Sequence, residues 1–209
     1  MDLRGKTLVF NDTSYADVTG SGPIVSPLNA ISVCSWVKDL SVGEHAIFSI
    51  SCPEEADEFI FWYESETELQ IWMKDSSTTY VDTTYDQKWH HLCISWASVG
   101  GVAKFYEDGL LILNIGNFRA GEQIRGGGYM IVGQEQDTNG GGFDIPQAFN
   151  GEMTALNVWD EVITDSLILT LSECHHYGSG TYYSWIDDVA DVYFLEDVYT
   201  SSFCGTLNL

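Results

Sequence analysis

Basic residues are scarce in this sequence. It carries 8 Lys and Arg against 31 Asp and Glu, and its formal net charge at pH 7 is -23. A field of this sign repels the phosphates of nucleic acid and the headgroups of anionic lipids, so we expect no nucleic acid as a general partner. The same field favours divalent cations, because clustered carboxylates repel one another until a hard metal neutralises them.

Long hydrophobic runs are also missing. No stretch approaches the roughly 20 consecutive apolar residues of a membrane span, so we expect no such span. Residues 1–10 carry Arg4 and Lys6 but no apolar signal core, and we expect the numbering to begin after any signal peptide. The sequon at Asn11, Asp12 and Thr13 is compatible with secretion.

Helical periodicity is confined to one segment. Thr164 can cap a first turn, Asp165 suits the positive end of the helix dipole, and Leu167, Ile168 and Leu171 follow at helical spacing. The pattern predicts one short α-helix over residues 165–173, lying on a sheet face.

Short runs in which apolar and polar residues alternate dominate the rest of the chain, and clusters of Gly, Asp, Ser and Asn separate them. They occupy residues 7–10, 31–37, 46–50, 58–63, 68–73, 91–96, 103–107 and 130–132. The rhythm predicts an all-β, two-sheet antiparallel jelly-roll sandwich, with the last strands in the tail from residue 177. The Asp108-Gly109 pair predicts a hairpin tip. No repeat or low-complexity linker interrupts the pattern, so we expect a single domain over residues 1–209.

The eight residues 91–98 read His-Leu-Cys-Ile-Ser-Trp-Ala-Ser. They match the H-x-C-x-S-W-x-S signature, and the chain therefore resembles the pentraxins, the family of C-reactive protein and serum amyloid P component. Further runs of the family follow in order at residues 133–137, 140–143, 147, 151–152 and 157–160. The similarity extends from about Lys6 to about Leu171, and the divergent tail resembles invertebrate, arthropod-type members.

An even set of cysteines is absent, since the chain has five. The resemblance implies a bridge between Cys34 and Cys93, and a second between Cys174 and Cys204 as in arthropod members. Cys52 then remains, either as a buried thiol or as an intermolecular bridge.

The loop of residues 135–147 is rich in oxygen ligands of the kind that Ca²⁺ prefers. The resemblance implies two calcium ions here. Glu135, the Gln136 carbonyl and Asp137 would be shared or adjacent, and Asp144 and Gln147 would complete the outer ion. Asp144 stands where the family usually has Glu, and its shorter side chain would loosen that ion.

A second loop, at residues 52–58, should supply the remaining ligands. The resemblance places an Asp-Asn pair of the family at Ala56 and Asp57. Asp57 can bind a metal and Ala56 cannot. Either the inner ion loses one carboxylate, or Glu54 or Glu55 reaches in.

Three apolar side chains match the family's pocket for the organic group of a phosphorylated ligand. They are Ile60, Trp62 and Trp72, and their parity along two strands predicts that all three lie on one sheet face. Indole rings there could hold a choline or ethanolamine cation. Packing in the core or against another subunit is the alternative explanation.

Three functions compete. The resemblance favours a secreted, calcium-dependent pattern-recognition lectin of haemolymph or plasma, which forms a cyclic ring, pentameric or larger, and binds phosphoethanolamine, phosphocholine or anionic saccharide. A laminin-G-like adhesion module is the alternative. A jelly-roll glycoside hydrolase fits less well, because Glu135 and Asp137 lie in a glycine-rich loop rather than on a rigid strand, so we expect no enzymatic activity.

Overall fold

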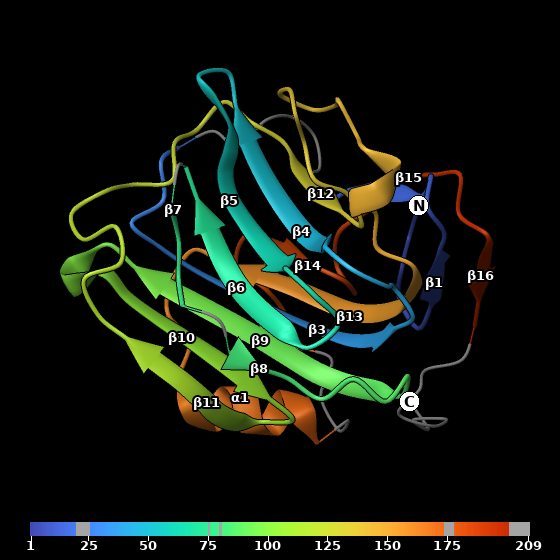
Figure 1. The fold of residues 1–209 in the computed structure, drawn as a ribbon. Helices are drawn as coiled ribbons and strands as arrows, with labels where there is room; N and C mark the ends of the chain where they lie inside the picture. Colours follow the sequence, from blue (N-terminus) through green and yellow to red (C-terminus); the bar gives the residue numbers. More distant parts are fainter. Residues whose placement is uncertain (20–25, 75, 80, 174–177, 201–209) are drawn as a thin grey trace.

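The computed structural model describes residues 1–19, 26–74, 76–79, 81–173 and 178–200. Two antiparallel sheets pack face to face (Figure 1). This arrangement confirms the predicted all-β, two-sheet antiparallel sandwich.

The first sheet has the order β11-β10-β9-β3-β13-β1-β16, with β14 paired to β13. Its strands are β1 (Thr7–Phe10), β3 (Ala30–Asp39), β9 (Trp89–Ala97), β10 (Val102–Glu107), β11 (Leu110–Ile115), β13 (Gly151–Trp159), β14 (Tyr183–Ser184) and β16 (Asp197–Tyr199). The second sheet has the order β15-β2-β12-β4-β5-β6-β7, with β8 paired to β6. Its strands are β2 (Tyr15–Asp17), β4 (His45–Cys52), β5 (Glu55–Tyr63), β6 (Glu68–Met73), β7 (Ser76–Ser77), β8 (Val81–Asp82), β12 (Met130–Val132) and β15 (Asp191–Tyr193). The other described elements are two 3-10 turns, η1 (Val99–Gly101) and η2 (Ile145–Gln147), and one helix, α1 (Asp165–Ser172).

Strand alternation decides which side chains reach the core. On β5, Phe59, Phe61 and Tyr63 join the main core cluster, whereas Ile60 and Trp62 form a separate cluster on the outer face of the second sheet. Successive side chains of a strand point to opposite faces, so this separation follows directly from the sequence. The outer face of the second sheet therefore carries apolar side chains outside the main core.

The hairpin predicted at Asp108 is confirmed. β10 and β11 pair through Glu107 and Leu110, and the two residues between them both have positive φ, 49° for Asp108 and 80° for Gly109. Such a turn matches the twist of the strands and favours glycine at its second position. The predicted strands in the tail are also confirmed, as β14, β15 and β16.

The single predicted helix is confirmed as α1 (Asp165–Ser172), which ends one residue earlier than expected. Thr164 accepts a hydrogen bond from the Leu167 N–H at 3.2 Å, as an N-cap should. Ile168 and Leu171 are buried, but Leu167 is exposed rather than part of the packed face. No helix among the described residues is long and apolar enough to cross a membrane.

The two outer faces of the sandwich carry different structures. α1 packs on the outer face of the first sheet, where it covers Cys34, Cys93, Tyr106 and Trp159. Figure 1 shows α1 beneath β9, β10 and β11, and the loop after β12 at the far side of the molecule. That loop leaves the second sheet and holds the predicted metal ligands.

Candidate metal centre and ligand pocket

The side chain of Gln136 helps to hold the loop after β12 against β4. The Gln136 amide donates to Ser49 Oγ at 2.9 Å, and its oxygen accepts from Ser51 Oγ at 2.8 Å and from the Gly140 N–H at 3.0 Å. Gln136 is fully buried, so its side chain is committed to this network. The backbone carbonyl of Gln136 is therefore the group left to bind a metal, and it is the group that the resemblance implies.

The loop and the start of β5 meet at one open pocket of about 360 Å³. Four of the predicted metal ligands line it, together with all three predicted apolar residues. The lining residues are Asp57, Glu135, Asp137, Gln147, Ile60, Trp62 and Trp72, joined by Glu44 and Glu64. Residues separated by about 80 positions in the chain therefore share one site.

Glu135 is the most constrained group of this pocket. It is 6% exposed, and its Oε2 has no hydrogen-bond partner among the described residues. Burial, the contact with Asp57 and the charge of Asp137 raise the pKa of the Glu135 carboxyl to about 8. None of the described lining residues is Lys or Arg, so no basic side chain of the pocket wall compensates these carboxylates.

Glu58 follows Asp57 directly but faces elsewhere. Its buried carboxylate accepts from the Arg125 backbone N–H at 2.6 Å and from the Arg125 guanidinium at 2.6 and 2.9 Å. Lys74 lies 3.8 Å away. This paired charge anchors the start of β5, and so fixes where Asp57 stands.

Neither Glu54 nor Glu55 is among the described residues that line the pocket. Glu55 instead lies 4.0 Å from Arg125 and accepts from the Asp57 N–H at 3.4 Å. Cys52 is a free, buried thiol 3.5 Å from Glu58, and burial raises its pKa to about 11. It corresponds to the buried-thiol alternative.

Asp144 stands apart from the other predicted ligands. Its side chain is exposed and is not among the described residues that line the pocket, although its backbone carbonyl accepts from the Gln147 N–H at 2.9 Å. Its role at an outer ion stays a prediction.

The apolar wall has the predicted geometry. Ile60 and Trp72 are direct cross-strand neighbours, and both lie with Trp62 in one cluster on the outer face. Trp62 Nε1 donates to Glu64 at 3.1 Å, while Trp72 Nε1 has no hydrogen-bond partner among the described residues. The wall thus combines an apolar surface with an unused donor and the carboxylate of Glu64.

Comparison with known proteins agrees with the family resemblance of the sequence. A family model described as "Pentaxin family" matches residues 6–192. The chain belongs to the pentraxin family. It is 32% identical to neuronal pentraxin-1 of Rattus norvegicus over 196 residues, 93% of this chain and 45% of that protein. It is 31% identical to the human neuronal pentraxin receptor over 185 residues, 88% of this chain and 36% of that protein.

This pentraxin chain therefore spans less than half the length of these curated relatives. Among solved structures it is similar to the native heptameric SAP-like pentraxin from Limulus polyphemus. That match has a TM-score of 0.84 at 26% identity and covers 99% of this chain and all of that one. It confirms the jelly-roll fold over the whole length compared.

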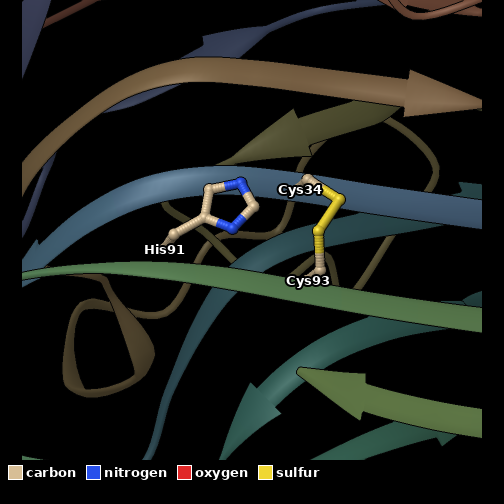
Figure 2. A group of neighbouring side chains, drawn as sticks. All are labelled: Cys34, His91 and Cys93. Atoms are coloured by element: carbon tan, nitrogen blue, oxygen red, sulfur yellow. A yellow bond between two sulfur atoms is a disulfide. The ribbon is translucent and has the colours of Figure 1, made fainter. Parts of the chain in front are cut away.

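The pentraxin bridge between Cys34 and Cys93 is present, with a sequence separation of 59 residues. Cys174 and Cys204 lie outside the described residues. His91 lies beside the bridge (Figure 2), but sulfurs bonded to each other cannot act as thiolate ligands, so these three residues do not form a metal site. Burial lowers the pKa of His91 to about 4, so the imidazole is neutral at physiological pH.

Two residues of the pocket were not predicted from the sequence, Glu44 and Glu64. Glu44 precedes β4 and Glu64 follows β5, both in acidic, polar connections that look like many others in this chain. The signal that could have identified Glu64 is strand parity, because it continues the series 60, 62, 64 on the outer face.

Proposed function

We propose that this pentraxin is a secreted, calcium-dependent binding protein that captures ligands with a phosphate or another anionic group. The observation that carries the proposal is the convergence of Asp57, Glu135, Asp137 and Gln147 on one pocket beside an apolar wall. Four oxygen-bearing side chains from two distant segments are the donor set of a hard cation, and no described lining residue is basic.

The residues fit calcium in number and in kind. Asp57, Glu135, Asp137, Gln147 and the Gln136 carbonyl supply oxygen only, and Ca²⁺ takes about six to eight oxygens in an adaptable geometry. Glu135 Oε2 is buried and has no hydrogen-bond partner in the described part of the chain, so it is a polar atom that a cation would satisfy. We propose two ions per chain, with Asp144 contributing to the outer one.

Bound calcium would supply open coordination positions to an anionic oxygen. The chain itself would hold the rest of the ligand. Ile60, Trp62 and Trp72 offer a surface for methylene or methyl groups, and Glu64 at the end of that surface favours a positive charge. Phosphoethanolamine and phosphocholine combine these features, and an anionic saccharide could use the metal alone.

Weak binding at one site becomes useful through repetition. We propose a cyclic homo-oligomer, pentameric or larger, made of single-domain chains that present their pockets together. The similar Limulus pentraxin is described as heptameric. The Cys34–Cys93 bridge supports an extracellular location, such as haemolymph or plasma, because disulfides persist in oxidising compartments.

The experiment that tests the proposal is chromatography on a phosphoethanolamine resin. The wild-type chain should be retained in calcium and released by EDTA, and both Glu135→Ala and Asp137→Ala should flow through although they remain folded by circular dichroism. Glu161→Ala, an exposed carboxylate near the start of α1, is the matched control and should be retained.

Unchanged retention of the two site variants would refute the proposed site. Calcium-independent retention of the wild type, or no retention at all, would also count against the proposal.

A further inference from the structure

A second cavity lies on the other side of the loop after β12. It has a volume of about 480 Å³ and is lined from four segments of the chain, by Asp12, Thr13, Tyr15, Gln134, Phe143, Ile145 and Phe194. Its described lining shares no residue with the candidate metal pocket. Gln134 lines this cavity and Glu135, the next residue, lines the metal pocket, so the loop separates the two.

The aromatic side chains at this cavity hold one another in place. Tyr15 stacks on its cross-strand neighbour Tyr193 at 4.6 Å between ring centroids, and it contacts Phe143 at 4.4 Å. Ala16 turns inward into the core, so Tyr15 belongs to the outer face of the second sheet. Rings fixed by one another in this way offer an apolar surface without further ordering.

Phe194 is the most unusual residue of the cavity. Its side chain is 73% exposed, and its backbone has a positive φ of 53°. Its carbonyl accepts from Ser14 Oγ at 2.7 Å, which ties this backbone to the turn after β1. The phenyl ring is therefore held in solvent, where a ligand can cover it.

Polar groups accompany the rings. Gln134 is 1% exposed, and its amide donates to the Asp12 and Ser14 carbonyls at 3.3 and 3.2 Å. Its Oε1 has no hydrogen-bond partner among the described residues. The carboxylate of Asp12 and the hydroxyl of Thr13 stand at the rim, and no described lining residue is Lys or Arg.

We propose that this second cavity is a binding site for a neutral saccharide ring. The apolar face of a sugar stacks on aromatic side chains, and its hydroxyls donate to acceptors such as the Asp12 carboxylate and the Gln134 carbonyl. Asp12 and the net charge of the chain disfavour an anionic occupant. None of the described lining residues of this cavity lines the metal pocket, so the two sites can be tested separately.

Saturation-transfer NMR on the full chain in EDTA tests this site, with methyl glycosides of glucose, galactose, mannose and N-acetylglucosamine as probes. At least one glycoside should receive saturation on one face of its ring. Phe194→Ala should weaken its binding about tenfold or more. Asp12→Asn should weaken it as well, because a charged acceptor is lost. Leu110→Ala, an exposed apolar residue on β11, and Glu135→Gln should leave it unchanged.

Three results would overturn the proposal. The first is that no glycoside binds in EDTA, including the case in which only a hydrophobic dye binds this surface. The second is binding that persists at wild-type strength in both Phe194→Ala and Asp12→Asn. The third is binding in EDTA that disappears in Glu135→Gln, since that sugar would occupy the metal pocket. Because the assay runs without calcium, its failure leaves the proposed metal site standing.

Discussion

The fold holds the Glu135 carboxyl in a position where its ionised form is unfavourable without a metal. Its carboxyl is buried against Asp57 and close to Asp137, and these neighbours together with burial hold its pKa at about 8. An unfolded glutamate ionises near pH 4.5. Between these two values the folded chain binds more protons than the unfolded chain, so without metal this group makes stability fall as pH rises.

Replacing the charge should therefore stabilise the metal-free protein. In EDTA at pH 8, Glu135→Gln should melt about 2–4 °C above wild type, the shift expected for about 1 kcal/mol in a chain of this size. Calcium should raise the melting temperature of wild type and not that of the variant. Differential scanning calorimetry measures both. A variant that melts below wild type in EDTA would contradict the account, and Glu161→Gln is the control.

Calcium affinity should depend on pH through the same residue. A proton and the metal compete for Glu135, so affinity should decline as pH falls below about 8, by up to about tenfold per pH unit. Titrations between pH 6 and 9 with a calcium electrode measure this slope. An affinity that is constant over that range would show that Glu135 is not a ligand.

Residue chemistry and the family pattern together predicted part of this site. Asp57, Glu135, Asp137 and Gln147 were expected on the basis of oxygen-rich loops and the family pattern, and they do line one pocket. Glu44 was not predicted, because a single acidic residue in a polar connection carries no spacing signal among 31 acids, and Glu64 was missed although it continues the outer-face series 60, 62, 64. The partner of Glu58 could not be predicted either, since Arg125 lies 67 residues away.

Elements with a local signal were predicted well. The helix has its cap at Thr164 and the hairpin its turn at Asp108 and Gly109, because both depend on a few adjacent residues. The exposure of Leu167 was not predicted, because it depends on how α1 rests against β9 and β10 rather than on helical spacing. Loop paths depend on tertiary contacts and leave little trace in the sequence.

The cap of α1 gives a test at this scale. Thr164→Ala should lower the free energy of unfolding by about 1 kcal/mol, because the Leu167 N–H loses its acceptor. Thr164→Ser keeps the hydroxyl and should stay close to wild type. Urea denaturation followed by fluorescence measures both. Equal losses in the two variants would show that the methyl group, not the cap, matters.

At the scale of the whole molecule, the two sheets carry different structures on their outer faces. The first sheet carries the disulfide beneath α1 on its outer face, and the second carries the candidate metal pocket on its own outer face. The jelly-roll core between them connects these faces without sharing their residues. The two functions of stability and binding should therefore be separable.

Removal of the disulfide tests this separation. The double variant Cys34→Ala, Cys93→Ala should lose about 2–4 kcal/mol of stability, because the bridge closes a long loop in the unfolded chain. Its calcium affinity, measured under conditions where it is folded, should equal that of wild type. A folded double variant without calcium binding would show that the two faces are coupled.

The central claim is that the loop after β12 and the start of β5 together hold calcium. Isothermal titration of calcium into the wild-type chain, Asp137→Asn and the control Glu161→Gln tests it most directly. The account predicts saturable binding of two ions per chain in wild type and control, and its loss or strong weakening in Asp137→Asn. Absence of saturable binding in wild type, or an Asp137→Asn curve that superimposes on it, would contradict the account.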